Sequence, residues 1–375
     1  MTEQTKRTWA EIHLDRLADN YHTLRSLAPN SLFAGLVKAN AYGHGAVAVA
    51  RKLEELGADW LLVAALDEAT ELREAGIRAP ILILGYTPAE YAGRLLELDL
   101  TQTIYDMEQA KAFSAAACEL GRPLNCHLKA DTGMSRLGIL CDEVHLEDSA
   151  RLLADMARLP GLKAEGIFMH FADADTSPEY SNLQITRFQT LLARLEELGV
   201  TFAIRHCCAG AATINYPRMH LDMIRPGILL YGHMPDHACD GTLPLVPVME
   251  LKTRVASVKH LPKGTCVSYG RTHVLERDSL VAAVPIGYGD GLFRLLSGRQ
   301  EMLIRGRRVA QIGRVCMDMC MLDVTDLKQV KVGDEVTVFG RDLPLEEKAD
   351  AVGTITYELL CAVSPRVPRV YLDKA

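Results

Sequence analysis

Eight short apolar runs alternate with amphipathic segments through the first 225 residues, and this alternation constrains the fold more than any other feature of the sequence. The segments between the runs, such as 67–75, 106–120 and 182–198, have helical spacing, and each is followed by a glycine that can end a helix. Eight strand–helix units predict an α/β fold, a (β/α)8 TIM barrel, better than a doubly wound sheet. The expected strands are residues 31–37, 60–66, 80–84, 102–105, 124–130, 163–169, 202–206 and 221–225.

The pattern changes after about residue 244. The remaining chain has β-type runs separated by turns such as Lys263-Gly264 and Gly333-Asp334, and a short helix is expected over 354–362. We therefore predict two domains, a barrel over residues 1–240 and a mostly β domain over residues 241–375, with a boundary rich in Pro, Gly and His. The expected β segments are 248–261, 266–269, 280–286, 301–324 and 335–339.

Composition excludes several classes of protein. The 375 residues are 49% hydrophobic and 24% charged, and the net charge of −7 comes from interspersed charges, which argues against a nucleic-acid partner. No apolar run reaches the length of a membrane-spanning helix, and the first residues lack the apolar core of a signal peptide, so a cytoplasmic protein is expected. Ten scattered cysteines predict reduced thiols. His233, His237, Cys239 and Asp240 lack a second ligand pair, and no metal is predicted.

The first apolar run ends in Lys38, which is followed by a turn containing Gly43-His44-Gly45. A buried strand would aim this amine into a pocket, where a lysine with a lowered pKa forms a Schiff base with pyridoxal phosphate (PLP) or with a substrate. The same residues also fit a loose G-x-G-x-x-A pattern of a dinucleotide-binding loop, although the bulky Tyr42 would crowd such a turn. On this stretch alone, a phosphate loop, a lysine site and a plain turn remain open.

Further polar residues follow other strands of the predicted barrel. Arg136 follows the fifth strand, His170 the sixth and Arg225 the eighth. The small residues of 207–212 and 226–228 follow the seventh and eighth strands, where barrels commonly hold phosphate through backbone N–H groups. Because the carboxyl ends of barrel strands share one face, these residues predict one site.

Several motifs along nearly the whole chain resemble the alanine racemase family. The stretch Val37-Lys38-Ala39-Asn40-Ala41-Tyr42-Gly43-His44-Gly45 is similar to the PLP-lysine motif of that family. Similar stretches are 129–138, 170–175, 225–228, Tyr269-Gly270, 287–291 and Cys316-Met317-Asp318. The resemblance implies a PLP-dependent enzyme that racemises L- and D-alanine, supplies D-alanine for peptidoglycan, and forms a homodimer whose sites are shared across the interface.

The resemblance also implies roles for individual residues. Lys38 would hold PLP and act as one base, Tyr269 would be the second base, and His170 beside Arg225 would assist it, with Arg225 facing the pyridine nitrogen. Tyr42, Gly210, Gly227, Ile228 and Tyr357 would hold the phosphate; Arg136, Met317 and Tyr288 would bind the substrate; and Lys129 corresponds to a lysine that is carbamylated in some members.

The chain departs from the family at one point and leaves some alternatives open. Ala209-Gly210 stands where family members commonly have Asn-Ser, so a phosphate-binding hydroxyl is missing and we expect Gly210→Ser to tighten PLP binding. The alternatives are a serine or broad-specificity racemase, a barrel-type PLP decarboxylase and a non-enzymatic PLP carrier. The second domain with Tyr269 and the Met317 motif argues against a carrier.

Overall fold

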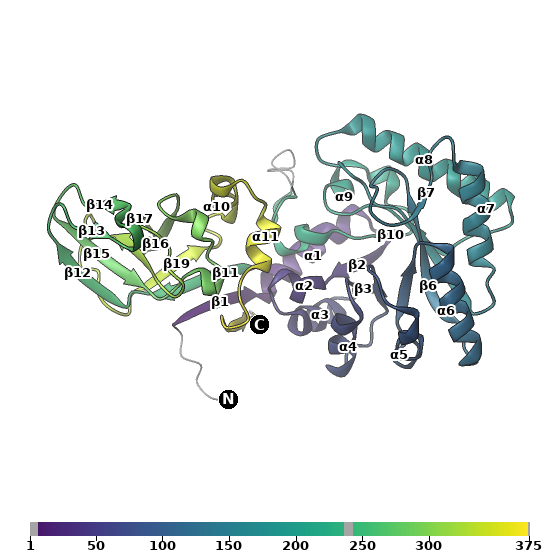
Figure 1. Ribbon diagram of the computed structural model, residues 1–375, viewed down its shortest axis with the longest axis horizontal. Helices are drawn as coiled ribbons and strands as arrows, with labels where there is room; N and C mark the ends of the chain where they lie inside the picture. The colour runs from purple at the N-terminus through teal and green to yellow at the C-terminus, as the bar shows by residue number, and fades with distance from the viewer. Residues whose placement is uncertain (1–6, 236–242, 374–375) are drawn as a thin grey trace. The chain divides into compact units, whose positions relative to one another are not determined.

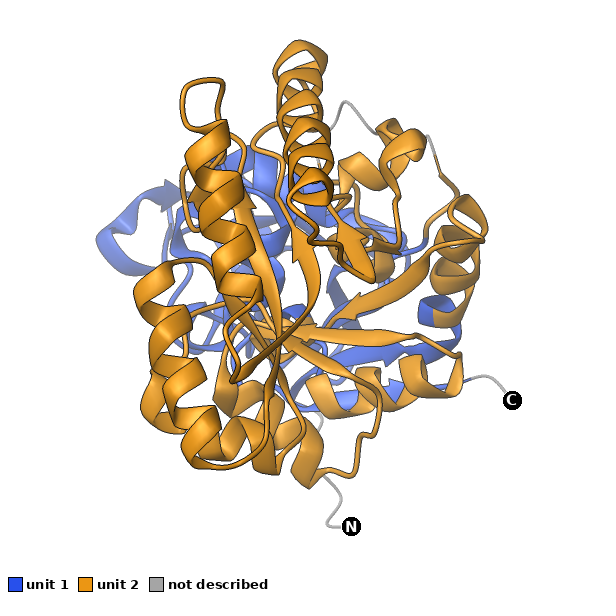
Figure 2. Ribbon diagram, turned by 90° about the vertical axis from the view of Figure 1, so that its right-hand side faces the viewer, with its two compact units in different colours: residues 1–17, 42–45, 246–375 blue, residues 18–41, 46–245 orange. Residues whose placement is uncertain are grey.

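The computed structural model describes residues 7–235 and 243–373. It divides into two compact units (Figure 2). Unit 1 comprises residues 1–17, 42–45 and 246–375, and unit 2 comprises residues 18–41 and 46–245. His237, Cys239 and Asp240 of the histidine-bearing loop lie outside the described residues. Among the described helices, none has both the length and the apolar character needed to cross a membrane.

Eight parallel strands form the centre of unit 2, in the order β10-β2-β3-β4-β5-β6-β8-β9. The ring closes between β9 and β10, where Asp222 N donates to Arg205 O (3.0 Å) and Arg225 N donates to Cys208 O (2.9 Å). The predicted barrel is therefore confirmed. The strands are β2 (Leu32–Leu36), β3 (Trp60–Val63), β4 (Ile81–Ile83), β5 (Thr101–Ile104), β6 (Leu124–Asp131), β8 (Leu162–Phe168), β9 (Ile204–His206) and β10 (Met223–Ile224), and the short β7 (Ile139–Leu140) pairs with β6.

The helices of the barrel surround these strands (Figure 2). Three of them end at the predicted glycines Gly76, Gly121 and Gly199, which have φ values of 87°, 71° and 74°. A left-handed residue at this position turns the chain out of the helix, and glycine adopts it without a steric penalty. The helices are α1 (Leu14–Leu27), α3 (Ala46–Glu55), α4 (Leu66–Glu74), α5 (Ala92–Glu97), α6 (Met107–Glu119), α7 (Leu146–Ala157), α8 (Pro178–Glu197) and α9 (Ala211–Asn215).

Unit 1 is built on a nine-stranded sheet in the order β12-β15-β18-β17-β16-β19-β11-β1-β20. The predicted mostly β character of this part is confirmed. Its elements are β1 (Thr8–His13), β11 (Met249–Arg254), β12 (Ser257–Leu261), β15 (Ser279–Val284), β16 (Glu301–Ile304), β17 (Arg307–Ile312), β18 (Cys320–Asp323), β19 (Glu335–Phe339) and β20 (Arg369–Leu372), with the hairpin β13 (Cys266–Val267) and β14 (His273–Val274) and the helices α10 (Leu345–Val352) and α11 (Thr356–Cys361).

The N-terminal strand β1 lies inside this sheet, although the sequence analysis predicts no strand before residue 31. Ala10 pairs with Leu251 of β11 on one side and with Arg369 of β20 on the other. Figure 1 shows β1, in purple, beside the green β11. Both partners follow it by more than 200 residues, and local periodicity carries no information about such pairing. Residues 7–17 thus belong to unit 1, whereas the sequence analysis assigned residues 1–240 to the barrel domain.

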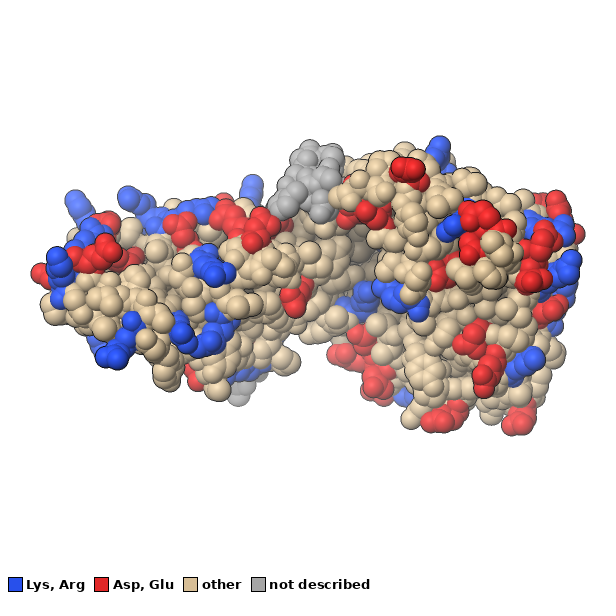
Figure 3. All heavy atoms as spheres, turned by 45° about the horizontal axis from the view of Figure 1, so that its top comes forward, with Lys and Arg blue, Asp and Glu red and all other residues tan. Residues whose placement is uncertain are grey.

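Acidic and basic side chains are interspersed on the face of the molecule drawn in Figure 3. This arrangement agrees with the mixed charge pattern of the sequence and its small net charge of −7.

Candidate active site

A cavity of about 230 Å³ lies at the carboxyl ends of the barrel strands. Five of the predicted site residues line it together: Lys38, Lys129, Arg136, His170 and Arg225. The other lining residues are Leu36, Ala64, Leu84, Gly85, Leu137, Phe168 and Ala209. Four lysine or arginine side chains and no Asp or Glu therefore face this space. Such a cavity attracts anionic groups because its positive charges are not neutralised by lining carboxylates.

Lys38 is held at the start of an unusual turn that follows β2. The next four residues, Ala39, Asn40, Ala41 and Tyr42, all have φ values of 50–53°, which is the left-handed helical region. This conformation costs roughly 1–2 kcal/mol per residue for an L-amino acid. Two side chains support it: Glu68 Oε1 accepts from Ala39 N (2.6 Å), and Asn40 Oδ1 accepts from Ala46 N (2.8 Å). A strained segment at the end of a buried strand is typical of a functional site.

Arg136 is carried by a loop that Asp131 organises at the end of β6. One oxygen of Asp131 accepts from the backbone N–H groups of Gly133, Met134 and Ser135 at 2.9, 2.9 and 3.0 Å. On the same strand, burial together with the charges of Arg136 and Arg225 lowers the pKa of Lys129 to about 8. Its Nζ lies 5.3 Å from the centre of the Phe168 ring.

Arg225 is fully buried behind the cavity and is held by several acceptors. Its Nη2 donates to Met169 O and Cys207 O, both at 3.0 Å, and lies 3.4 Å from His170 Nδ1. Burial lowers the pKa of Arg225 to about 10, so the guanidinium stays charged at neutral pH. Burial and the charge of Arg225 also hold the pKa of His170 well below its usual value, so its imidazole is neutral.

Two further histidines extend this group, and the sequence analysis missed both. His206 Nδ1 contacts Arg225 Nη1, and His206 Nε2 lies 2.9 Å from His127 Nδ1. The ring of His206 also stacks on Phe168 with the ring centres 4.6 Å apart. Burial holds the pKa of His206 well below its usual value and lowers that of His127 to about 3. Histidines within the apolar runs 124–130 and 202–206 were the available signal, because a buried polar ring needs a partner.

The predicted phosphate-binding residues lie in both units. In unit 2, Gly210 caps the start of α9 with φ 45° and ψ −122°, and Gly227 has φ 61° at the start of the turn that contains Ile228. The conformation of Gly210 is essentially restricted to glycine. In unit 1, the rings of Tyr42 and Tyr357 meet edge to face with their centres 5.9 Å apart. These two tyrosines therefore pack against each other, and their phosphate-binding roles stay a prediction.

Three predicted residues of unit 1 are exposed. The sequence analysis expected Tyr269 in a strand over 266–269. It lies instead in a short turn after β13, between Ser268 (φ 66°) and Gly270 (φ 72°). This backbone presents its side chain outward, and the residue is 69% exposed. Tyr288 and Met317 are also exposed, and their loops are joined by hydrogen bonds from Tyr288 N to Cys316 O (3.0 Å) and from Gly289 N to Met317 O (2.9 Å).

The residues that line the cavity fit PLP. A lysine at the strand end can bind its aldehyde carbon, and the surrounding cations suit its phosphate and an amino-acid carboxylate. The lining residues include no acid to protonate the pyridine nitrogen, so Arg225 is the available hydrogen-bond donor.

The chain matches two family models over most of its length. Residues 12–235 match the model "Alanine racemase, N-terminal domain", and residues 248–371 match "Alanine racemase, C-terminal domain". The alanine racemase of Desulfovibrio desulfuricans is 45% identical over the full length of both chains. The alanine racemase structure from Clostridium difficile 630 is 39% identical, covers 98% of this chain and 96% of its own, and has a TM-score of 0.93.

A third relative carries a ligand. The alanine racemase structure from Bacillus anthracis with bound L-Ala-P is 35% identical, covers 98% of this chain and 95% of its own, and has a TM-score of 0.90. Full-length identity at this level, the two family models and the lysine-bearing cavity of the barrel agree. The chain therefore belongs to the alanine racemase family of PLP-dependent isomerases.

Proposed function

We propose that this alanine racemase moves the α-proton of alanine between two bases, Lys38 and Tyr269. The observation that carries the proposal is the position of Lys38, which ends a barrel strand and lines a cavity with three other cations and no carboxylate. Racemisation requires removal of a proton from one face of the α-carbon and delivery of a proton to the other. PLP, when bound, supplies an electron sink for that carbon.

Residues around the cavity would hold and orient the reacting groups. Arg136, with Met317 and Tyr288, would bind the substrate carboxylate, because a guanidinium offers paired donors to a carboxylate. Arg225 would donate a hydrogen bond to the pyridine nitrogen and keep its own proton. The phosphate would be held by Tyr42, Gly210, Gly227, Ile228 and Tyr357, through hydroxyls and backbone N–H groups.

Tyr269 needs assistance, since a phenol has a reference pKa of about 10. His170 is suited to this task because its imidazole is neutral and its Nδ1 can accept a hydrogen bond from Arg225 Nη2, 3.4 Å away. The ring proton is then on Nε2, which can donate a hydrogen bond to the oxygen of Tyr269 and so favour the phenolate that acts as a base. We infer that His170 and Arg225 are positioning residues for the second base.

We further infer a homodimer in which Tyr269 of one copy serves the barrel of the other. The exposure of Tyr269 supports this inference, because a base must be shielded from water to act selectively. Other large apolar side chains of unit 1 are also exposed, as expected of a surface that contacts a second copy of the chain. They are Val274, Tyr288, Leu295, Met317 and Met319.

The substrate preference is tested by following the loss of optical rotation with L-alanine and L-serine side by side. Alanine should be racemised with the higher kcat/KM. Equal or better turnover of serine would instead favour a racemase of broad specificity.

We predict that Lys129 is carbamylated, with its neutral amine adding to CO2 and releasing one proton. The carbamate would place a negative charge near Arg136 and Arg225, two of the cations that now lower the pKa of Lys129. Because only the neutral amine reacts and the pKa is about 8, occupancy should rise as the pH increases from 7 to 9. Carbon-13 NMR with labelled bicarbonate measures it, and Lys129→Gln is the control that should lose the signal. An unmodified Lys129 at pH 9 would contradict the prediction.

The geometry of Gly210 revises the expected effect of a serine at this position. Because φ 45° and ψ −122° strain any side chain, the strain of roughly 1–3 kcal/mol can offset a hydrogen bond to phosphate, which is worth roughly 1.5–3 kcal/mol. Gly210→Ala carries the strain without the hydroxyl and is the matched control. We expect Gly210→Ala to bind PLP more weakly than the parent, and Gly210→Ser to bind it about 10- to 150-fold more tightly than Gly210→Ala. Equal affinity of the two variants by equilibrium dialysis would show that the hydroxyl does not reach the phosphate.

A further inference from the structure

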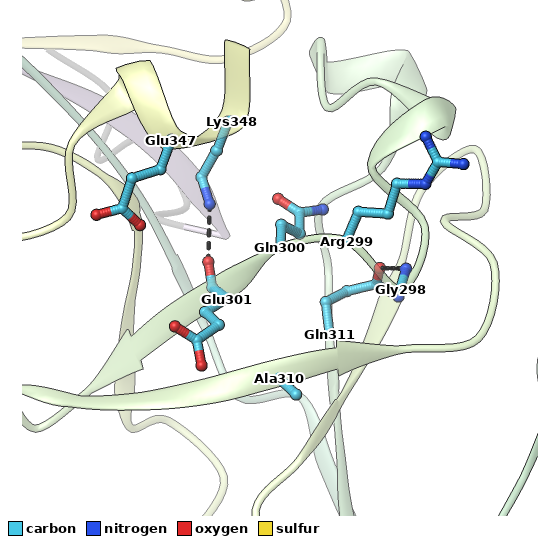
Figure 4. A pocket seen from close by; sticks show the side chains of 8 residues that line it. All are labelled: Gly298, Arg299, Gln300, Glu301, Ala310, Gln311, Glu347 and Lys348. Atoms are coloured by element: carbon cyan, nitrogen blue, oxygen red, sulfur yellow. Dashed lines mark hydrogen bonds between the residues drawn. The ribbon is translucent and has the colours of Figure 1, made fainter. Parts of the chain in front are cut away.

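A second cavity lies within unit 1 and shares no residue with the cavity around Lys38. It has a volume of about 280 Å³. A single water molecule needs only about 10–15 Å³, so the cavity has room for a small ligand. Its walls come from the loop before β16, from the first residue of β16, from β17 and from α10 (Figure 4). The lining residues are Gly298, Arg299, Gln300, Glu301, Ala310, Gln311, Glu347 and Lys348.

Lys348 brings a buried positive charge to this cavity. The residue is 3% exposed, and its Nζ donates to the backbone oxygen of Glu301 (2.7 Å). Among the described residues, no carboxylate lies within ion-pair distance of this ammonium. Burial lowers the pKa of Lys348 to about 8, so it is still mainly protonated at neutral pH. A buried ammonium retains two further N–H donors, and it is stabilised by an anionic partner.

Gln300 supplies an amide that lacks partners within the described protein. The residue is 7% exposed, and neither its Oε1 nor its Nε2 has a hydrogen bond. In Figure 4 this amide and the ammonium of Lys348 face the same space, whereas the guanidinium of Arg299 points away from it. A buried amide without hydrogen-bond partners lowers the stability of the fold. A ligand with one donor and one acceptor would satisfy both the Oε1 and the Nε2 of Gln300.

Two carboxylates complete the polar lining. Glu301 and Glu347 are both bound by Arg308, at 3.2 Å for Glu301 and at 2.6 and 2.7 Å for Glu347. Both side chains are 46% exposed, and in Figure 4 their carboxylates point away from the Gln300 amide. The ammonium of Lys348 and an amide with both atoms available match the carboxylate and the ammonium of a zwitterion. Ala310 is the only lining side chain that is wholly apolar, so the cavity offers little surface for a large apolar substituent.

We propose that this cavity binds a small α-amino acid, separately from the catalytic site. The carboxylate of the ligand accepts from Lys348 Nζ and Gln300 Nε2. Its ammonium donates to Gln300 Oε1. Alanine is the natural first probe because the family's reaction keeps it available to the enzyme.

The test is equilibrium dialysis of carbon-14 alanine against full-length holoenzyme reduced with borohydride. Reduction converts the imine between lysine and PLP into an amine, which the amino group of alanine cannot attack. Covalent capture of the label by PLP is therefore prevented. We expect saturable binding of alanine, weakened about tenfold or more in Lys348→Met, which removes a charged hydrogen bond. Gln300→Leu should weaken it severalfold. Both variants should fold, because each replaces a buried polar group without a full set of partners by an apolar one of similar size.

The matched control is Lys263→Met, which removes an exposed lysine of the same unit and should bind alanine like the parent. Unlabelled acetate and methylamine are used as competitors. Weak competition by both would support recognition of the whole zwitterion. The proposal is wrong if Lys348→Met and Gln300→Leu bind as tightly as the control, if no saturable binding occurs, or if acetate displaces the label as well as alanine does.

Discussion

Replacement of Lys38 by alanine is expected to abolish racemisation and to remove the lysine to which borohydride fixes PLP. Both losses have one cause, because the same amine would bind the aldehyde carbon of PLP and act as a base. Loss of proton transfer alone reduces a rate by about 10²–10⁴-fold, so activity should fall at least that far in either direction. The measurements are the change in optical rotation and peptide mapping after reduction with tritiated borohydride.

A matched control separates this effect from damage to the fold. Lys111→Ala removes an exposed lysine of α6 and should retain full labelling and activity. Thermal unfolding of Lys38→Ala should be measured in parallel, because Lys38 precedes the strained turn of Ala39 to Tyr42. Two results for Lys38→Ala would refute the assignment of Lys38. One is label that remains on the peptide that includes position 38, and the other is label that moves in full yield to Lys129 while activity is retained.

Replacement of Tyr269 by phenylalanine is expected to slow racemisation by about 10²–10⁴-fold while one proton exchange survives. The variant keeps the ring and removes only the hydroxyl. Because the two bases would face opposite sides of the α-carbon, exchange of the α-proton should be lost for one alanine enantiomer far more than for the other. Deuterium incorporation from heavy water, followed separately for L- and D-alanine, measures this asymmetry.

Tyr91→Phe is the matched control for this experiment, since Tyr91 is an exposed tyrosine that does not line the catalytic cavity. It should exchange both enantiomers at the parent rates. Equal loss of exchange for L- and D-alanine in Tyr269→Phe would argue against a mechanism with two bases on opposite faces.

The order of the barrel could be predicted from sequence because its information is local. Each strand of unit 2 is a short apolar run, each helix has its own periodicity, and parallel neighbours follow one another along the chain. The sheet of unit 1 is different. β1 pairs with β11 and β20, which follow it by more than 200 residues, and no local pattern distinguishes those partners from other β segments.

Some residues of the active site could likewise be predicted from the sequence, and others could not. Lys38, Arg136, His170 and Arg225 could be predicted to meet because the carboxyl ends of barrel strands share one face, and the family motifs pointed to the same residues. The positions of His127 and His206 within apolar runs indicated buried polar rings, but only the packed barrel shows which partners they have and that His206 contacts Arg225. Their role depends on contacts between strands and not on residue type.

The sequence by itself determined the element order, the barrel, the lysine at the end of its first strand and the resemblance to one enzyme family, since each is recorded in neighbouring residues. Only the tertiary structure decided the left-handed turn after Lys38, the φ of 45° at Gly210 and the exposed turn of Tyr269. It also decided that Lys348 and Gln300, 48 positions apart in sequence, face one cavity. Backbone conformation and burial at these positions follow from packing against distant segments, which no local pattern encodes.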